Sequence, residues 1–83
     1  MKTFMYTVTN QRTGKSFDLM NTKELVDYLD NAEYDAATLA VNSEKENPAG
    51  YLAWVTRQAL AQYDYAVVAM QDGVVNIECI ELD

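Results

Sequence analysis

Hydrophobic and polar residues alternate with a period of two over residues 2–9, and the alternation returns in "SFDLM" after the segment "NQRTGK". The apolar side of the first run consists of Phe4, Tyr6 and Val8. Alternation of aromatic or β-branched residues with polar ones is typical of a half-buried strand. Gly14 can adopt the positive φ that a tight turn requires. We therefore expect a β-hairpin over residues 2–20, with Phe17 and Leu19 directed inward.

A second hairpin is expected further along the chain, where the β-rich runs "YAVVAM" and "VVNIECIEL" flank the Asp-Gly dipeptide at 72–73. Asp-Gly is a strong signal for a two-residue type I′ turn, which here would pair Gln71 with Val74. One face of this hairpin is expected to join the core, namely Ala66, Val68, Met70, Val75, Ile77 and Cys79. Beyond this set the alternation changes phase. The change predicts either a β-bulge near residues 78–79 or an outer face that is also covered.

A capped amphipathic helix is expected in the segment "NTKELVDYLDNAEYD", residues 21–35. Asn21 is a favourable N-cap, and Glu24 three residues later completes an asparagine version of the capping box. At about 100° per residue, one face of this helix is apolar and consists of Leu25, Tyr28, Leu29 and Ala32. The opposite face carries Glu24, Asp27 and Asp30. We expect the helix to end near Asn31 or Ala32.

Another helix is expected from Asn47-Pro48 to about Tyr63, because asparagine caps a helix well and proline is favoured at the first helical position. Its expected apolar face consists of Tyr51, Leu52, Val55, Ala59 and Tyr63. The opposite side is also mostly apolar, with Ala53, Trp54, Arg57, Leu60 and Ala61. The helix is therefore either buried on most sides or presents a second apolar surface to a partner. The pattern of residues 33–47 is compatible with a short helix, a strand or irregular structure.

The order of these elements predicts a small α+β fold in one domain, residues 1–83. We expect an antiparallel β-sheet built from the N-terminal and C-terminal hairpins. Two helices between them, in the order ββααββ, are expected to pack on one face of the sheet.

The charge of the chain is strongly negative and unevenly distributed. Thirteen acidic residues against six basic ones give a formal net charge of −7. Residues 24–46 hold one base, Lys45, and seven acids: Glu24, Asp27, Asp30, Glu33, Asp35, Glu44 and Glu46. A protein that binds DNA or RNA directly needs a basic footprint, and this chain lacks one. The acidity instead favours docking to a basic protein surface.

Candidate catalytic chemistry is scarce. The chain has no histidine and a single cysteine, Cys79, so one copy can form neither a zinc site nor a Cys-His nucleophile, nor an internal disulfide. The run "TGKS" at residues 13–16 lacks the first glycine of a phosphate-binding loop and is expected to join two strands rather than to begin a helix. We expect no enzyme activity, catalytic residue, cofactor or metal. The absence of a signal sequence or a membrane-length apolar run, together with the lone cysteine, predicts a cytoplasmic protein that has no contact with a membrane.

Three features suggest a binding function. The acids of the first helix repeat at intervals of about 4.5 Å, of the same order as the spacing of about 3.4 Å between phosphates along one DNA strand. Trp54 and Arg57 lie one turn apart and are of the residue types that anchor interfaces, although Trp54 could equally fill a small core. The third is the outer face of the C-terminal hairpin, with Tyr65, Val67, Ile80 and Leu82. The expected partner-binding residues are Glu24, Asp27, Asp30, Glu33, Asp35, Glu44, Glu46, Trp54 and Arg57.

Two functional hypotheses follow. The first is a non-enzymatic inhibitor or antagonist that docks on a basic, nucleic-acid-binding protein, in part by mimicking DNA phosphates. In size and charge the chain is similar to phage and mobile-element products such as anti-CRISPR and anti-restriction proteins. The alternative is a structural or assembly module that forms a homodimer or larger homo-oligomer through its hairpin face, with the acidity serving solubility only.

Overall fold

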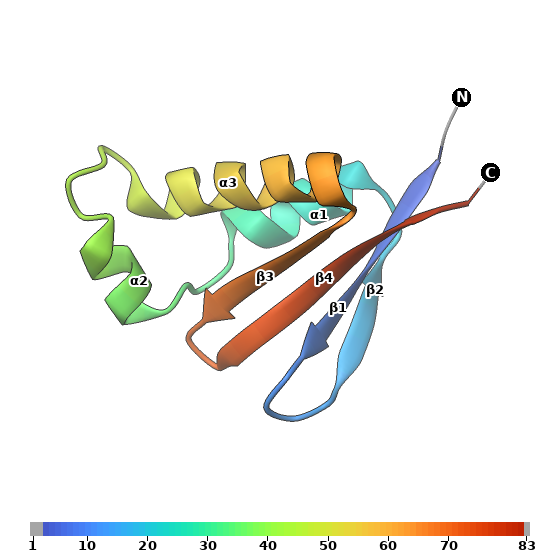
Figure 1. Cartoon of the computed structure of the whole chain (residues 1–83), viewed down its shortest axis with the longest axis horizontal. Coiled ribbons are helices and arrows are strands. Elements are labelled where there is room, and N and C mark those ends of the chain that lie inside the picture. Colours follow the sequence, from blue (N-terminus) through green and yellow to red (C-terminus); the bar gives the residue numbers. More distant parts are fainter. Residues whose placement is uncertain (1–2, 83) are drawn as a thin grey trace.

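A computed structural model of the chain describes residues 3–82, which form a four-stranded antiparallel sheet and, within these residues, three helices (Figure 1). The elements in chain order are β1 (Phe4–Asn10), β2 (Ser16–Leu19), α1 (Thr22–Asp30), α2 (Ala36–Val41), α3 (Pro48–Tyr63), β3 (Tyr65–Met70) and β4 (Gly73–Glu81). The strands are arranged in the order β2-β1-β4-β3. Helices α1 and α3 pack on the same face of this sheet, and α2 lies apart from them (Figure 1). The expected α+β class and antiparallel sheet are confirmed.

The predicted order ββααββ is wrong, because the undecided segment contains the short helix α2. The side chain of Asp35 caps this helix and accepts hydrogen bonds from the backbone N–H of Thr38, at 3.1 Å, and from its hydroxyl, at 3.2 Å. Leu39 packs against the core. Six residues make less than two helical turns, too few to reveal a period of 3.6 in the sequence.

The N-terminal hairpin is confirmed, with Tyr6 opposite Leu19 and Val8 opposite Phe17. The inward position of Phe17 is only partly right, since 49% of this residue remains exposed. Phe17 lies on the edge strand β2, where its ring contacts Tyr28 of α1 edge to face, with centroids 5.5 Å apart. A residue on an edge strand has a neighbouring strand on one side only, so helix contact does not bury it completely.

The C-terminal hairpin has the predicted buried face but not the predicted turn. Met70 pairs with Gly73, and the loop consists of Gln71 and Asp72 rather than the Asp-Gly dipeptide. Val74 therefore lies opposite Ala69 rather than opposite the predicted Gln71, a shift of two residues in the pairing. Because side chains alternate between the two faces of a strand, a shift of two leaves the same side chains on each face. Gly73 has φ +131°, a value that side chains other than glycine rarely adopt, and a Cβ added there would lie 3.3 Å from Cβ of Arg12.

Strand β4 is central in the sheet and pairs regularly with β1 from Val75 to Glu81. No bulge interrupts this pairing, and no element among residues 3–82 covers the outer face of the sheet. The predicted bulge is therefore wrong, and no cover of the outer face is found within residues 3–82. Ile80 and Leu82 instead lie exposed on the outer face, whereas Ile77 of the same strand is fully buried against the helices.

Helix α1 begins and ends as expected. The side chain of Asn21 accepts a hydrogen bond from the backbone N–H of Glu24 at 2.9 Å. The carboxylate of Glu24 reaches back and accepts from the backbone N–H of Met20. Leu25 and Leu29 are buried in the core, and Asn31 closes the helix.

Replacement of Asn21 with alanine is expected to lower the free energy of unfolding by about 1 kcal/mol, because the N–H of Glu24 then loses its acceptor. Chemical denaturation of the two proteins measures the difference. A glycine at the same position is the matched control and should cost only a few tenths of a kcal/mol, since water can then reach the free N–H. Equal losses for alanine and glycine would contradict the capping role.

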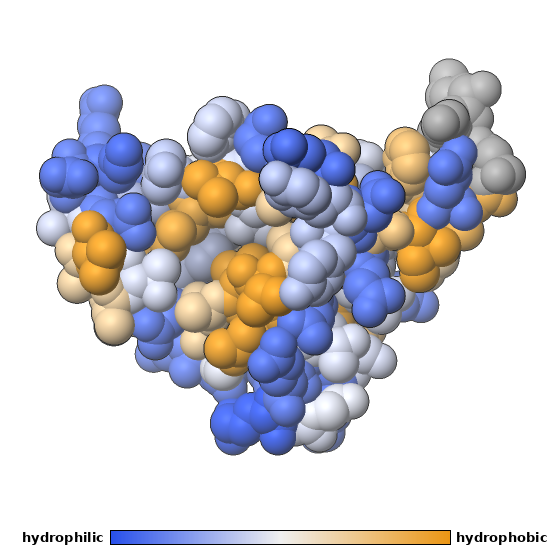
Figure 2. All heavy atoms as spheres, in the orientation of Figure 1, coloured by the Kyte–Doolittle hydropathy of each residue, from blue (hydrophilic) through white to orange (hydrophobic). Residues whose placement is uncertain are grey.

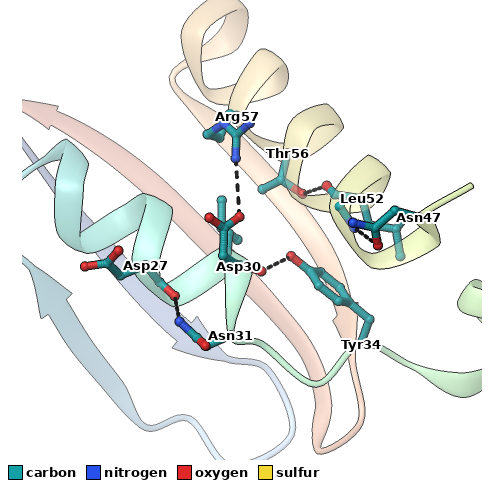
Figure 3. Close-up of polar contacts among 10 residues, drawn as sticks. Asp27, Asp30, Asn31, Tyr34, Asn47, Leu52, Thr56 and Arg57 are labelled. Atoms are coloured by element: carbon teal, nitrogen blue, oxygen red, sulfur yellow. Dashed lines mark hydrogen bonds and ion pairs between the residues drawn. The ribbon is translucent and has the colours of Figure 1, made fainter.

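Helix α3 is confirmed in extent, but its buried face was predicted only in part: Leu52 and Ala59 do pack against the core. Ala53, Thr56 and Leu60 face the core, whereas 65% of Tyr63 is exposed and Val55 also reaches the surface. The hydroxyl of the buried Thr56 donates to the C=O of Leu52 at 2.8 Å, which satisfies it inside the helix (Figure 3). An apolar pattern around most of a helix does not specify which side is buried. The small residues Ala53 and Thr56 determine which side is buried, because they allow α3 to approach the sheet closely.

Candidate functional site

The acidic row of α1 exists in the structure, but none of its three carboxylates is isolated. Glu24 is engaged in the helix cap. Asp27 forms an exposed ion pair with Lys23 one turn before it, with Nζ and Oδ2 2.8 Å apart. Asp30 lies 3.7 Å from a guanidinium nitrogen of Arg57 on α3. Because each carboxylate has a partner within the protein, the three resemble the unpaired phosphates of a DNA strand less closely than their spacing in the sequence suggested.

The ion pair between Asp30 and Arg57 joins the two helices that cover the sheet (Figure 3). Asp30 is the last residue of α1, where the helix dipole is unfavourable for a negative charge, and the last turn has no basic residue of its own. Arg57 supplies the missing positive charge from α3. Its nearest contact to the carboxylate is longer than a hydrogen bond, so its N–H groups remain able to bind another acceptor.

The remaining acids lie in two other places. Asp35 caps α2, and Glu33 precedes it in the segment between α1 and α2. Glu44 and Glu46 lie in the turn between α2 and α3, exposed and with no ion pair or hydrogen bond among the residues that the structure describes. Together with Glu33, which is also exposed and whose side chain has no ion pair or hydrogen bond among the described residues, these two carboxylates are the least committed of the seven.

Trp54 lies on the surface of α3, with 51% of the residue exposed. Its ring is tilted toward that of Tyr51 one turn earlier, with centroids 6.3 Å apart. The Nζ of Lys45 lies 4.5 Å from the centroid of Tyr51, a cation–π arrangement that fixes the turn before the helix. The structure therefore places Trp54 outside the core, which was the open question about this residue.

The outward side of α3 is almost free of charge. At about 100° per residue, the side opposite the buried Leu60 consists of Tyr51, Trp54, Val55, Gln58 and Gln62. Arg57 is the one charged residue in the sixteen of this helix. Tyr51 and Lys45 were not among the expected partner-binding residues. A signal for this part of the surface was present in the sequence: α3 has a single charged residue in a protein whose net charge is −7.

Together these residues form a surface that we call the α3 surface, defined by Tyr51, Trp54, Val55, Arg57, Glu44, Glu46 and Asp30. An aromatic pair occupies its middle. Glu44 and Glu46 lie on the turn that leads into α3, and Asp30 lies beside Arg57 on the neighbouring helix.

Burial perturbs several ionisable groups inside the fold. Burial, reinforced by Asp64, raises the pKa of the Cys79 thiol, so the thiol stays protonated and weakly nucleophilic at neutral pH. Cys79 lines a hollow of about 380 Å³ between α1, α3 and the sheet, together with Tyr6, Leu25, Leu60 and Arg57. Residues 3–82 contain no cluster of acidic, cysteine or histidine side chains that could hold a metal ion.

Tyr34 is the most strongly perturbed group. Burial, and secondarily the negative charge of Asp30, raise its pKa to about 12. Its hydroxyl donates to the C=O of Leu29 at 2.6 Å, at the end of α1 where carbonyl groups lack partners within the helix (Figure 3). Burial also raises the pKa of Tyr28. These shifts arise chiefly from the burial of both side chains.

Comparison with known proteins does not assign the chain to a group: no protein-family model matches it, and neither a curated protein nor a solved structure is significantly similar. Within residues 3–82, no helix is long and apolar enough to cross a membrane.

Proposed function

We propose that this protein is a non-enzymatic inhibitor that docks on a basic, nucleic-acid-binding protein through the α3 surface. The observation that carries the proposal is the aromatic pair of half-buried Tyr51 and exposed Trp54 on an uncharged face of α3, bordered by carboxylates and by Lys45, whose Nζ lies over the Tyr51 ring. The proposed partner is of the type that anti-CRISPR and anti-restriction proteins act on, and the proposed location is the cytoplasm of the host cell.

The arrangement suits such a partner for two physical reasons. Aromatic side chains at the centre of an interface contribute most of its binding energy when water is excluded from them. Charges at the rim contribute chiefly to the rate and selectivity of association, because they remain hydrated while attracting opposite charge. Glu44 and Glu46 meet the second requirement, since both are exposed and form no ion pair among the described residues.

The decisive experiment is affinity capture from bacterial lysate with the immobilised protein, followed by mass spectrometry and by measurement of the partner's nucleic-acid binding. We expect a basic nucleic-acid-binding protein to be retained and to lose its affinity for DNA or RNA. Retention of no such protein at low salt would contradict the proposal.

Reversal of two uncommitted charges, Glu44→Lys with Glu46→Lys, is expected to reduce the association rate with that partner by about tenfold or more at an ionic strength of about 50 mM. Most of this difference should vanish at about 500 mM, where exposed charges are screened. The matched control is Asp18→Lys with Asp72→Lys, which changes the net charge equally on β2 and in the β3–β4 loop. If both double variants slow association alike, the effect belongs to the overall charge and not to the α3 surface.

A homo-oligomer formed through the outer face of the sheet is the second candidate. It is favoured by the exposure of Tyr65, Val67, Ile80 and Leu82 on that face. The face also carries Asp18 and Glu78 and, among the described residues, no basic side chain, so two copies would oppose like charges there. A monomer at every concentration in sedimentation equilibrium would remove this candidate.

A further inference from the structure

Strand β3 forms an edge of the sheet and lacks the features that usually protect such an edge. It pairs with β4 on one side and is last in the strand order. Its sequence, YAVVAM, contains neither a charged residue nor a proline. Natural proteins commonly protect an exposed edge with lysine, proline, a bulge or a covering segment, because unpaired backbone groups accept another strand.

One end of this edge is already occupied by the protein's own chain. The backbone N–H of Asp35 donates to the C=O of Ala69 at 3.0 Å, and the N–H of Gln71 donates to the C=O of Glu33 at 2.8 Å. Tyr34 thereby forms an isolated antiparallel bridge with Met70. The segment between α1 and α2 thus behaves as a very short fifth strand, and the edge is able to accept one.

The same geometry shows which backbone N–H and C=O groups of β3 remain without a hydrogen-bond partner. Backbone groups alternate between the two sides of a strand. Since Ala69 and Gln71 point to the free side, so do Val67 and Tyr65. Neither of these two has a hydrogen-bond partner on that side among residues 3–82. Their exposed fractions are 49% and 50%, and hydrophobic atoms gather over β3 in Figure 2.

The surroundings of the open stretch are acidic. Asp64 directly precedes β3, and Glu78 lies opposite Tyr65 on β4. Glu33 and Asp35 flank the bridge at the other end. A neutral, apolar stretch of edge bordered by four carboxylates favours an extended segment that carries apolar and basic residues in alternation, and disfavours a second copy of this acidic chain.

We infer that the open edge of β3, at Tyr65 to Val67, binds an extended basic segment of the partner protein by strand addition. This inference rests on the proposed function for the identity of the partner, but its own site is distinct from the α3 surface. Backbone hydrogen bonds to Val67 hold the segment, and the bordering carboxylates select its lysine or arginine residues.

The edge geometry itself is tested by hydrogen exchange. The amide of Val67 is expected to exchange faster than that of Val68 by on the order of a hundredfold, because Val68 is paired with Val75 inside the sheet. A heptapeptide of alternating lysine and valine serves as the probe. Its addition should slow exchange at Val67 and shift the NMR signals of residues 65–69.

Two control peptides and two variants separate strand addition from simple charge attraction. A heptapeptide of alternating glutamate and valine should not bind, and the lysine peptide methylated on alternate backbone nitrogens should bind about tenfold more weakly. Val67→Pro should abolish the protection while leaving the fold intact, because proline is tolerated where an edge N–H faces solvent. Val67→Thr keeps the N–H and should retain binding. Equal binding of the methylated peptide would overturn the inference, as would shifts confined to acidic side chains.

The same variants distinguish this inference from the proposed function. If Val67→Pro binds the captured partner as tightly as the unaltered protein, the inference fails and the proposed function stands. If no basic partner is found, the proposed function fails, while the peptide experiment still decides whether the edge accepts a strand.

Discussion

Replacement of Trp54 with alanine is expected to weaken binding to the nucleic-acid-binding partner by about 30-fold or more, which corresponds to about 2 kcal/mol. Half of the tryptophan is exposed in the free protein, so a large apolar area is available for burial by a partner. Titration calorimetry or surface plasmon resonance with the captured partner measures the change.

The stability of the protein should hardly change in this variant, because Trp54 contributes no buried core contact. Tyr63→Ala is the matched control, since Tyr63 is an exposed aromatic residue at the C-terminal end of the same helix and lies outside the α3 surface. The proposed role of Trp54 is wrong if both variants bind like the unaltered protein. A large fall in the melting temperature of Trp54→Ala would show instead that the side chain has a structural role.

The second large effect is expected at Tyr34. Its replacement with phenylalanine leaves the C=O of Leu29 without the donor that lies 2.6 Å away. A buried acceptor that loses its partner costs about 1–3 kcal/mol of stability. Denaturation at neutral pH should therefore show a loss of this size, although the phenylalanine ring fills almost the same volume.

The same residue makes stability depend on alkaline pH. Because the folded-state pKa of Tyr34 is about 12, against 10.0 for an ordinary tyrosine, the folded protein holds this proton more tightly than the unfolded chain. The resulting stabilisation is present below pH 10 and is lost as the pH rises toward 12, a change of roughly 2 to 3 kcal/mol. Tyr34→Phe should lack this part of the pH dependence. Parallel curves for the two proteins between pH 9 and 12 would contradict the assignment.

Much of the fold was predictable because its signals are local. Asn21 and Asn47 mark the starts of α1 and α3 through capping chemistry, which depends on residues within one turn. The period-two pattern of the two hairpins identified the buried face even where the pairing was shifted by two residues. Helix α2 remained one of three possibilities for its segment, because its capping residue, Asp35, precedes a helix of only six residues.

The candidate surface was harder to predict, because it depends on which side of a helix is left uncovered. The apolar residues of α3 surround most of the helix, so the sequence did not reveal whether Trp54 faces the core. The ion pair of Asp27 with Lys23, four residues earlier on the same helix, could have been read from the sequence, whereas the approach of Arg57 to Asp30 could not. The contact between Asp30 and Arg57 joins residues that are distant in sequence, and only the packing of the two helices brings them together.

The pairing of β1 with β4 also bears on how the protein is made. The earliest and latest of the described strands are the two that meet in the middle of the sheet, so the central hydrogen bonds connect residues more than sixty positions apart. During synthesis, the first hairpin and the helices leave the ribosome before β4 exists, and their apolar faces have no sheet to complete. Contacts of such long range form slowly, and their partners are exposed to misassociation in the meantime. The nascent chain therefore depends on β4 to complete its sheet, and removal of β4 should abolish the fold as a whole rather than trim one edge.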